Sequence, residues 1–167
     1  MSLSGRLDAR IFALLTGAAD HAVPQAPIDL DCGLDFTSGT GTDQANLIFS
    51  DQRTLGASAS ENLDVRGVLS DLLGNLLTMV KIKAILIKAS ANNTNNVVLG
   101  NDANSVQLGF SAITATWSIP PGGWFMVTAP AAGWQVSISG GGDIIKIANS
   151  GGATSVTYDI VVLGTDA

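Results

Sequence analysis

The sequence predicts an all-β fold: a jelly-roll-like β-sandwich of about eight to ten strands, preceded by an amphipathic α-helix. From Ile28 onward, about ten short segments rich in Val, Ile and Thr follow one another, and each ends in Gly, Pro or Asn. No period of about 20 to 50 residues recurs, which argues against a propeller or a solenoid. The 167 residues are enough for one domain with a full core.

The first segment is predicted to be a helix from about Leu3 to Ala18, ending near Gly17. We therefore divide the chain into an N-terminal arm at 1–20 and a sandwich domain at 21–167. Four large apolar side chains recur at helical spacing and form one stripe. Because this stripe is larger than a free surface helix exposes, we expect it to lie in an interface. Its members are Leu7, Ile11, Leu14 and Leu15.

An extended segment follows, because Pro24 and Pro27 exclude a helix there. From Ile28 to Phe36 apolar and polar residues alternate without a break, which predicts a half-buried antiparallel strand. Cys32 lies on the apolar face of this pattern, and we expect a small buried side chain there. Since it is the only cysteine, no intrachain disulfide or cysteine-based metal site can form.

The remainder of the chain alternates between strands and turns. The long strand in "TMVKIKAILIKAS" changes its pattern between Ile85 and Ile87, which indicates a bulge or burial on both faces. Farther on, "WQVSIS" is predicted to be a strand and "GGGD" the turn after it. The segment "RGVLSDLLGNLL" has mixed periodicity and predicts a single helical turn, since Gly74 would weaken anything longer.

The most polar stretch of its length is "IFSDQRTLGASASENLDV", from Ile48 to Val65. We interpret the part from Ser50 onward as a long irregular connection that leads into a short strand near Asn62 to Val65, and such loops commonly present contact surfaces. Arg53 can pair with Asp51, Glu61 or Asp64 and hold the loop in shape. We predict that these four charged residues belong to an interface.

The charge and hydropathy of the chain limit the kinds of partner that it can bind. The net charge of −6, from 8 basic and 14 acidic residues, disfavours phosphate backbones, so no nucleic acid is expected. The only basic cluster, Lys81, Lys83 and Lys88, is interpreted as charges that protect a sheet edge. No apolar run approaches the roughly 20 residues that span a bilayer, so no membrane partner is expected. Charged residues are only 13% of the chain, and large weakly charged surfaces often lie against other subunits.

No pattern predicts an enzyme, a cofactor or a metal site. His21, the only histidine, has no nucleophile motif nearby. Asp29, Asp31 and Asp35 share one face of a strand and are interpreted as solvated charges; the alternative is a calcium site that includes Asp43. The glycine-rich "GTGTD" and "SGGGD" match neither a dinucleotide-binding nor a phosphate-binding motif, and they predict turns.

The three tryptophans suit a core, an interface or a ligand platform. Trp117 alternates with apolar neighbours, which predicts a core position. Trp124 and Trp134 each begin a strand after a turn. We place these two in the core or in a subunit interface, and a sugar-binding platform is the alternative.

Four stretches carry a resemblance to a known class of proteins. They are "GTDQANLIFSDQRTLGASASENLDVRGVLSDLLG", "IKAILIKASANNTNNVVLGNDANSVQLGF", "PPGGWFMVTAPAAGWQV" and "DIIKIANSGGATSVTYDIVVLG". Together they resemble small structural proteins encoded among the virion genes of tailed bacteriophages and related prophages. The resemblance extends from about Phe36 to Gly164.

This resemblance implies a non-enzymatic subunit of a repeating shell or appendage. The expected role is a capsid decoration or cement protein on the virion exterior, present in the bacterial host cytoplasm during assembly. The implied partners are copies of the same chain, with a trimer favoured, and the phage major capsid protein or another virion protein. The alternative is a head-fibre, neck or tail component that acts as a glycan-binding adhesin.

Overall fold

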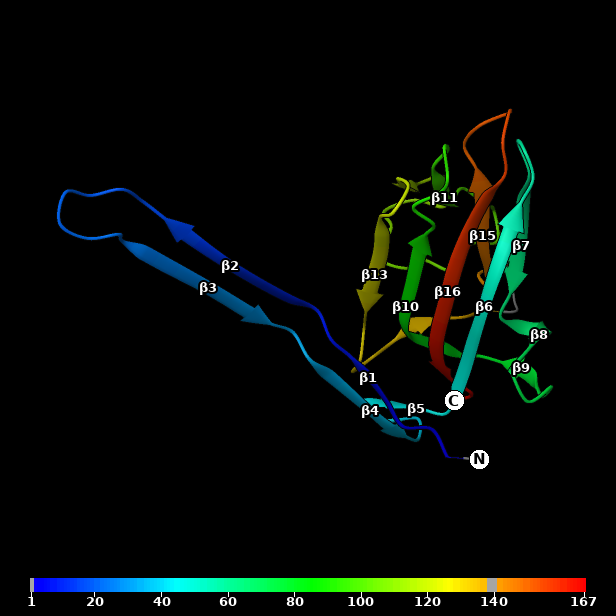
Figure 1. The fold of residues 1–167 in the computed structure, drawn as a ribbon. Coiled ribbons are helices and arrows are strands. Elements are labelled where there is room, and N and C mark those ends of the chain that lie inside the picture. The colour runs from blue at the N-terminus through cyan, green and yellow to red at the C-terminus, as the bar shows by residue number, and fades with distance from the viewer. Residues whose placement is uncertain (1, 138–140) are drawn as a thin grey trace.

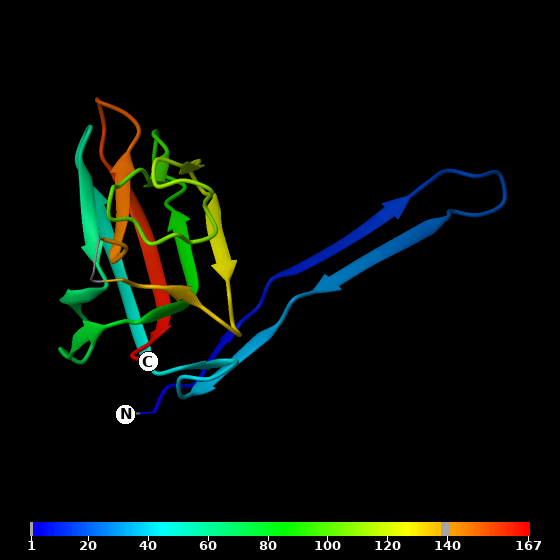
Figure 2. The same cartoon turned by 180° about the vertical axis from the view of Figure 1, so that it is seen from behind.

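The computed structural model describes residues 2–137 and 141–167, and within them it contains strands but no helix. Figures 1 and 2 show two parts: a sandwich of strands, and a long hairpin arm that projects from one end of it. The predicted all-β class is confirmed, and the arrangement of the sheets is consistent with the predicted β-sandwich. The end of the predicted strand "WQVSIS" and the start of the turn "GGGD", at 138–140, lie outside the described residues.

Two antiparallel sheets form the sandwich. The first has the order β13–β10–β16–β6, with β14 also paired to β10, and the second has the order β12–β11–β15–β7. The first sheet comprises β6 (Leu47–Leu55), β10 (Lys81–Ala89), β13 (Trp124–Thr128), β14 (Trp134–Gln135) and β16 (Val156–Thr165). The second comprises β7 (Ser60–Asp64), β11 (Val97–Gly100), β12 (Thr116–Ile119) and β15 (Ile144–Asn149).

The main core lies between these sheets, because alternate side chains of both point inward. Ile87 of the first sheet and Ile147 of the second are fully buried in it. The middle of β10 is buried on both faces, which confirms one of the two readings of its changed pattern. The register shift lies between Ile82 and Ala84 rather than between Ile85 and Ile87.

The arm is one continuous antiparallel ribbon built from two ladders. At its root β1 (Gly5–Leu7) pairs with β4 (Leu34–Ser38), and β5 (Gln44–Ala45) adds in parallel. Farther out β2 (Arg10–Thr16) pairs with β3 (Gln25–Asp31). Two residues separate the ladders on each strand, so both share one register.

The predicted helix from Leu3 to Ala18 is wrong, since this segment forms β1 and β2. Its apolar residues fit helical spacing, but Ile11, Ala13 and Leu15 also alternate with period two. The segment Gln25–Asp31 contains a proline and favours extended backbone, so it offers β2 a strand partner along its whole length. β3, placed by the sequence in the sandwich domain at 21–167, therefore belongs to the arm.

Two other local predictions are wrong. The polar stretch from Ser50 to Val65 is not a long loop, because β6 continues to Leu55 and only residues 56–59 separate it from β7, where a short strand was expected. Both strands lie at sheet edges, where polar side chains can face water without leaving the strand. The helical turn predicted between Arg66 and Leu77 is replaced by the hairpin of β8 (Arg66–Ser70) and β9 (Leu76–Thr78).

Candidate functional site

One face of the arm consists entirely of apolar side chains. Paired residues of β2 and β3 project to the same side of the ribbon. Three successive alternate pairs share this side: Ile11 with Leu30, Ala13 with Ile28, and Leu15 with Ala26. The four large side chains among them are between 57% and 72% exposed. We name these six residues the apolar arm face.

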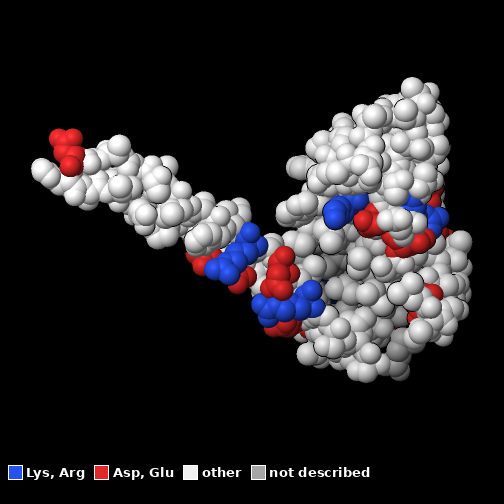
Figure 3. All heavy atoms as spheres, viewed as in Figure 1, with Lys and Arg blue, Asp and Glu red and all other residues white. Residues whose placement is uncertain are grey.

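The opposite face, which we name the mixed arm face, consists of the other four pairs: Arg10 with Asp31, Phe12 with Asp29, Leu14 with Pro27, and Thr16 with Gln25. Phe12 and Leu14 are 67% and 50% exposed. The Arg10 guanidinium donates to both carboxylate oxygens of Asp29, at 2.7 and 2.5 Å. Between Arg10 and Asp29 the only charged residue is Asp20. Figure 3 accordingly shows charge at the root and the tip of the arm and none along the ribbon between them.

Ion pairs occupy two of the three carboxylates that the sequence placed on one strand face: Asp29 pairs with Arg10, and Asp35 pairs with Arg6. Arg6 donates to Asp8 at 2.8 Å and to Asp35 at 3.0 Å. The hydrogen bond to Asp8 and the charge of Asp35 raise the pKa of Arg6. Among the described residues there is no group of three or more His, Cys, Asp or Glu side chains placed to hold a metal ion. The structure therefore gives the alternative calcium site no support.

A second, small core anchors the root of the arm to the outside of the first sheet. Phe36 and Ala45 from the root pack with Ala84 of β10 and Leu163 of β16. Leu7, one of the predicted interface residues, joins this cluster. The apolar side chain of Leu7 is thus used within the chain to attach the arm.

A buried lysine reinforces the anchor. The Lys83 Nζ donates to the carbonyl oxygens of Gly41, Pro130 and Ala131 at 3.0, 3.0 and 2.7 Å. These bonds tie the arm root to the turn after β13. Burial lowers the pKa of Lys83, and the nearby charge of Lys81 acts in the same direction. The interpretation of the three lysines as edge charges is wrong, because β10 lies inside its sheet.

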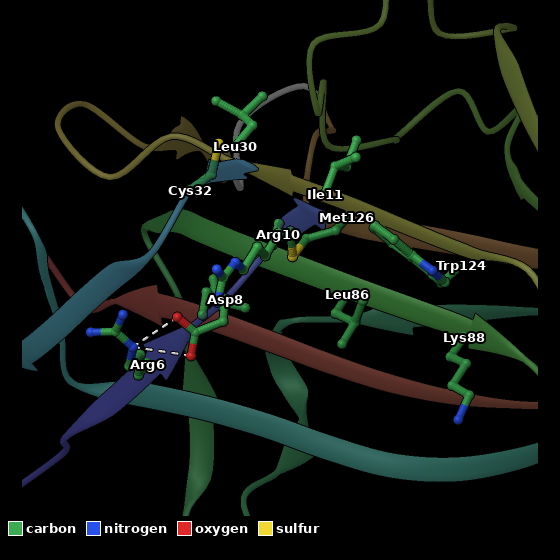
Figure 4. A pocket seen from close by; sticks show the side chains of 12 residues that line it. Arg6, Asp8, Arg10, Ile11, Leu30, Cys32, Leu86, Lys88, Trp124 and Met126 are labelled. Carbon is green, nitrogen blue, oxygen red and sulfur yellow. Dashed lines mark hydrogen bonds and ion pairs between the residues drawn. The ribbon is translucent and has the colours of Figure 1, made fainter. Parts of the chain in front are cut away.

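A cleft of about 660 Å³ lies between the arm and the outer face of the first sheet. The arm contributes Ile11, Leu30 and Cys32 to one wall, together with the root residues 6–10. The sheet contributes the other wall: Leu86, Lys88, Trp124 and Met126. Figure 4 shows these side chains from β2, β3, β10 and β13 around one space. Both walls are mainly apolar.

The cleft brings together residues that sequence reasoning treated separately. Ile11 and Trp124 were predicted interface residues, and both line it. Leu14 and Leu15 lie farther out on the arm. Sequence reasoning missed Leu86 and Met126, which become neighbours only through the β10–β13 register. Leu86 lies two residues before Lys88, and Met126 lies two residues after Trp124. Since residues two apart on a strand share a face, this spacing could have placed Leu86 and Met126 beside residues that the sequence had already singled out. Cys32 is exposed at the cleft, so its predicted burial is wrong.

The four charged residues of the polar stretch lie on the edge strands. Arg53 donates to Asp51 at 2.7 Å and to Glu61 at 2.6 Å, as the sequence suggested. Asp64 instead accepts the backbone N–H of Arg66 at 2.8 Å. Glu61 also accepts the hydroxyl of buried Tyr158 at 2.6 Å. Glu61 is in β7 of the second sheet, whereas Arg53 is in β6 and Tyr158 is in β16 of the first sheet. This network therefore links one sheet to the other.

The three tryptophans differ in how exposed they are, and the prediction for one of them is wrong. Trp117 is 52% exposed and packs on Phe125 with ring centroids 5.6 Å apart, so its predicted core position is wrong. Trp134 is half-buried against the main core. Trp124 is 60% exposed on the sheet wall of the cleft.

A second exposed apolar surface lies on the β8–β9 hairpin. It consists of Val68, Leu72, Leu73 and Leu76, each more than half exposed. Figures 1 and 2 show this hairpin on the side of the sandwich away from the arm. We name these four residues the β8–β9 patch.

His21 lies exposed in the tip of the arm between β2 and β3, far along the ribbon from the cleft. No helix in the described part of the chain is long and apolar enough to cross a membrane. In comparisons with known proteins, no protein-family model, curated protein or solved structure matches this chain.

Proposed function

We propose that this chain is a non-enzymatic structural subunit that self-associates and binds a repeating protein lattice. In view of the resemblance to tailed-phage virion proteins, the proposed role is capsid decoration or cement on the virion exterior. The observation that carries the proposal is the arm: a projecting ribbon with exposed apolar side chains on both faces, attached to a sandwich whose own core is closed.

An isolated two-stranded hairpin is marginally stable in water, so the arm needs a covering partner. Seven large apolar residues on it are 50–72% exposed: Ile11, Phe12, Leu14, Leu15, Val23, Ile28 and Leu30. Fully burying one such side chain is worth about 1.5–3 kcal/mol, so covering these seven from their present exposure is worth roughly 6–13 kcal/mol gross. This gain is comparable with the ~4–15 kcal/mol that association costs.

We infer that the sandwich is a jelly roll, as the sequence predicted. Its eight main strands, taken in chain order, pair first with last, second with seventh, third with sixth, and fourth with fifth. These pairs are β6 with β16, β7 with β15, β10 with β13, and β11 with β12. A long double ribbon of strands folded over itself into two sheets gives this pairing. Jelly rolls recur in viral capsid proteins and in lectins, so this topology is compatible with both candidate functions.

The β8–β9 patch supports a subunit with more than one contact. It lies away from the arm, so a lattice could engage one surface while copies engage the other. Contacts repeated by symmetry raise avidity by roughly 10² to 10⁴ over a single contact. The low charge of the chain fits surfaces that are buried in an assembly.

Co-sedimentation tests the lattice role. Purified protein is mixed with phage particles that lack it and, in parallel, with unassembled shell subunits. We expect it to pellet with the particles at a saturating ratio and to ignore the free subunits. A Leu73→Ser variant in the β8–β9 patch should bind particles more weakly yet self-associate normally. If the wild-type protein fails to pellet at any concentration, it is not a decoration protein.

The alternative function, glycan binding, rests on Trp124, whose exposed ring lines the cleft. A glycan array with the wild-type protein and the Trp124→Ala variant tests it. Trp134→Ala serves as the matched control, since that tryptophan is half-buried against the core. Binding that depends on Trp124 alone, together with no co-sedimentation, would replace the decoration role by the adhesin role.

A further inference from the structure

The apolar arm face is turned toward the sandwich of its own chain. Ile11 and Leu30 from that face line the same cleft as Leu86 and Met126 from the sheet. The two walls therefore face each other across a space that neither fills. Figures 1 and 2 show that the ribbon diverges from the sandwich beyond its root.

We propose that this cleft receives the hairpin arm of a second copy of the chain. The inference rests on the proposed function for the existence of a self-associating subunit, and it adds which two surfaces meet. A second arm is the right kind of occupant, because it is a thin apolar ribbon and itself needs cover on both faces. Its large apolar side chains are 50–72% exposed in the single chain, and the free energy of covering them is comparable with the cost of association.

Symmetry determines which faces meet when two copies exchange arms. The arm of the second copy lies between the sheet and the arm of the first, and the reverse also holds. Since each apolar arm face looks toward its own sheet, the two apolar arm faces must then face each other. Each mixed arm face is left against the outer sheet face of the other copy. The layers are sheet, arm, arm, sheet.

Side-chain sizes suit this order of layers. On the apolar arm face, Ala13 opposes Ile28 and Ala26 opposes Leu15, so a small side chain sits beside a large one in two successive rungs. Large side chains of one ribbon can enter the spaces over the alanines of the other, as in packed sheets. On the mixed arm face, Phe12 supplies an aromatic ring for a wall that carries a tryptophan and a methionine.

The β3 edge of the ribbon is a poor site for adding another strand, because Pro27 within β3 donates no backbone N–H there. Face-to-face packing in the cleft leaves this edge unused. The cleft volume also falls in the range of small-molecule sites, so an apolar ligand is the outcome opposed to an arm.

Light scattering on three single variants tests the exchange. Leu15→Lys places a charge on the apolar arm face, and Met126→Lys places one on the sheet wall of the cleft. Each should weaken self-association at least 100-fold, because each buries an unpaired charge at the contact. Ser60→Lys, on the exposed face of the second sheet, is the matched control and should associate as the wild type does. Unchanged thermal melting of the dilute variants verifies that the sandwich is folded.

Cross-linking then identifies the contact. In a Cys32→Ser background, a tagged chain carrying Leu14→Cys is mixed with an untagged chain carrying Met126→Cys. Oxidation should give a disulfide between the two chains, while Leu14→Cys with Ser60→Cys should give none. A chain carrying both Leu15→Cys and Met126→Cys tests the opposite case, because Leu15 lies on the face that looks toward its own sheet. A disulfide that forms only within that chain would show that the arm closes on its own sheet and would overturn the exchange.

The outcomes separate this inference from the proposed function. If Met126→Lys and Leu15→Lys associate like the wild type, or if the wild type stays monomeric and an apolar ligand fills the cleft, arm exchange is wrong. Particle binding by such a monomer would leave the decoration role intact. Arm exchange without any particle binding would support this inference and would overturn the decoration role.

Discussion

The sandwich and the arm use the same kind of strand but differ in what covers it. In the sandwich, alternate aliphatic side chains such as Ile87 and Ile147 are 0% exposed, because a second sheet faces the first. In the arm, Ile28 and Leu15 alternate in the same way and are 57% and 72% exposed. Alternation therefore identifies a strand with one apolar face, and it does not say whether that face is covered within the chain.

The polar groups of the two regions also differ in how far they are buried. At the arm root, Arg6 and Arg10 pair with aspartates in full contact with solvent, where such pairs contribute little to stability. In the sandwich, Glu61 accepts from buried Tyr158, and Lys83 is buried against three carbonyl groups. The polar interactions that hold the fold together are thus those of the sandwich and of the anchor.

One pair of matched substitutions measures the contrast directly. Ile87→Ala should lower the free energy of unfolding by about 2–5 kcal/mol, because it leaves a cavity in the main core. Ile28→Ala, the same change on the arm, should alter it by no more than about 0.5 kcal/mol. Urea denaturation is measured at a concentration where the chain is monomeric. Equal losses from both substitutions would mean that the arm packs on its own sandwich in solution.

The second prediction concerns the anchor between the two regions. Lys83→Met should cost about 1–3 kcal/mol, since the carbonyls of Gly41, Pro130 and Ala131 lose their donor. Lys88→Met, on the same strand with an exposed side chain, is the control and should be nearly neutral. Urea denaturation compares the two, and limited proteolysis should show earlier cleavage around residues 39–44 in the first variant alone. Equal stability of both variants would argue that packing of Phe36 and Ala45 suffices as an anchor.

The sequence predicted the all-β class and most strands of the sandwich, because β-branched residues and turn residues alternate there with little ambiguity. It failed at the start of the chain, where Ile11 and Leu15 satisfy both the helical and the strand period. The choice depended on β3, which is not adjacent in sequence. The polar edge strands were misread because only sheet order shows that Asp51 and Gln52 need no loop to reach water. The cleft depends on the pairing of Leu86 with Met126, a long-range register that the sequence does not reveal.

The third prediction tests the link between the two sheets. Tyr158→Phe should cost about 1–3 kcal/mol, because a buried hydroxyl bonded to a carboxylate is lost. Thr54→Val removes an exposed hydroxyl bonded to Thr157, the neighbour of Tyr158 in β16, and should change little. Chemical denaturation at neutral pH gives both values. If both variants lose a similar free energy of unfolding, the hydrogen bond between Tyr158 and Glu61 contributes no more than the weak surface contacts of the arm root.

The same tyrosine gives a dependence on alkaline pH. Burial, reinforced by the hydrogen bond to Glu61, raises the pKa of Tyr158 above its ordinary value of 10.0. The folded state then keeps its proton where the unfolded chain releases it, so the contribution is full below pH 10 and is lost as the pH rises above that value. Wild-type stability should decline there more steeply than that of Tyr158→Phe. Parallel curves for the two proteins would contradict this assignment.

The smallest predicted effect is local and lies in the β8–β9 hairpin, which resembles the arm in exposing its apolar residues. Asp71 accepts hydrogen bonds from the side chain and backbone of Asn75 and from the backbone N–H of Leu73. The bonds from Asn75 are the main reason that the pKa of Asp71 lies below its ordinary value of 3.8. Its contribution is therefore complete above pH 3.8 and is lost as the pH falls through the lowered pKa. Amide chemical shifts of Leu73 and Asn75 should titrate with a midpoint below 3.8 and should not titrate in Asp71→Asn, while the strands of the sandwich remain unchanged. A midpoint at 3.8 or above would mean that the hydrogen bonds to Asp71 do not hold this turn in solution.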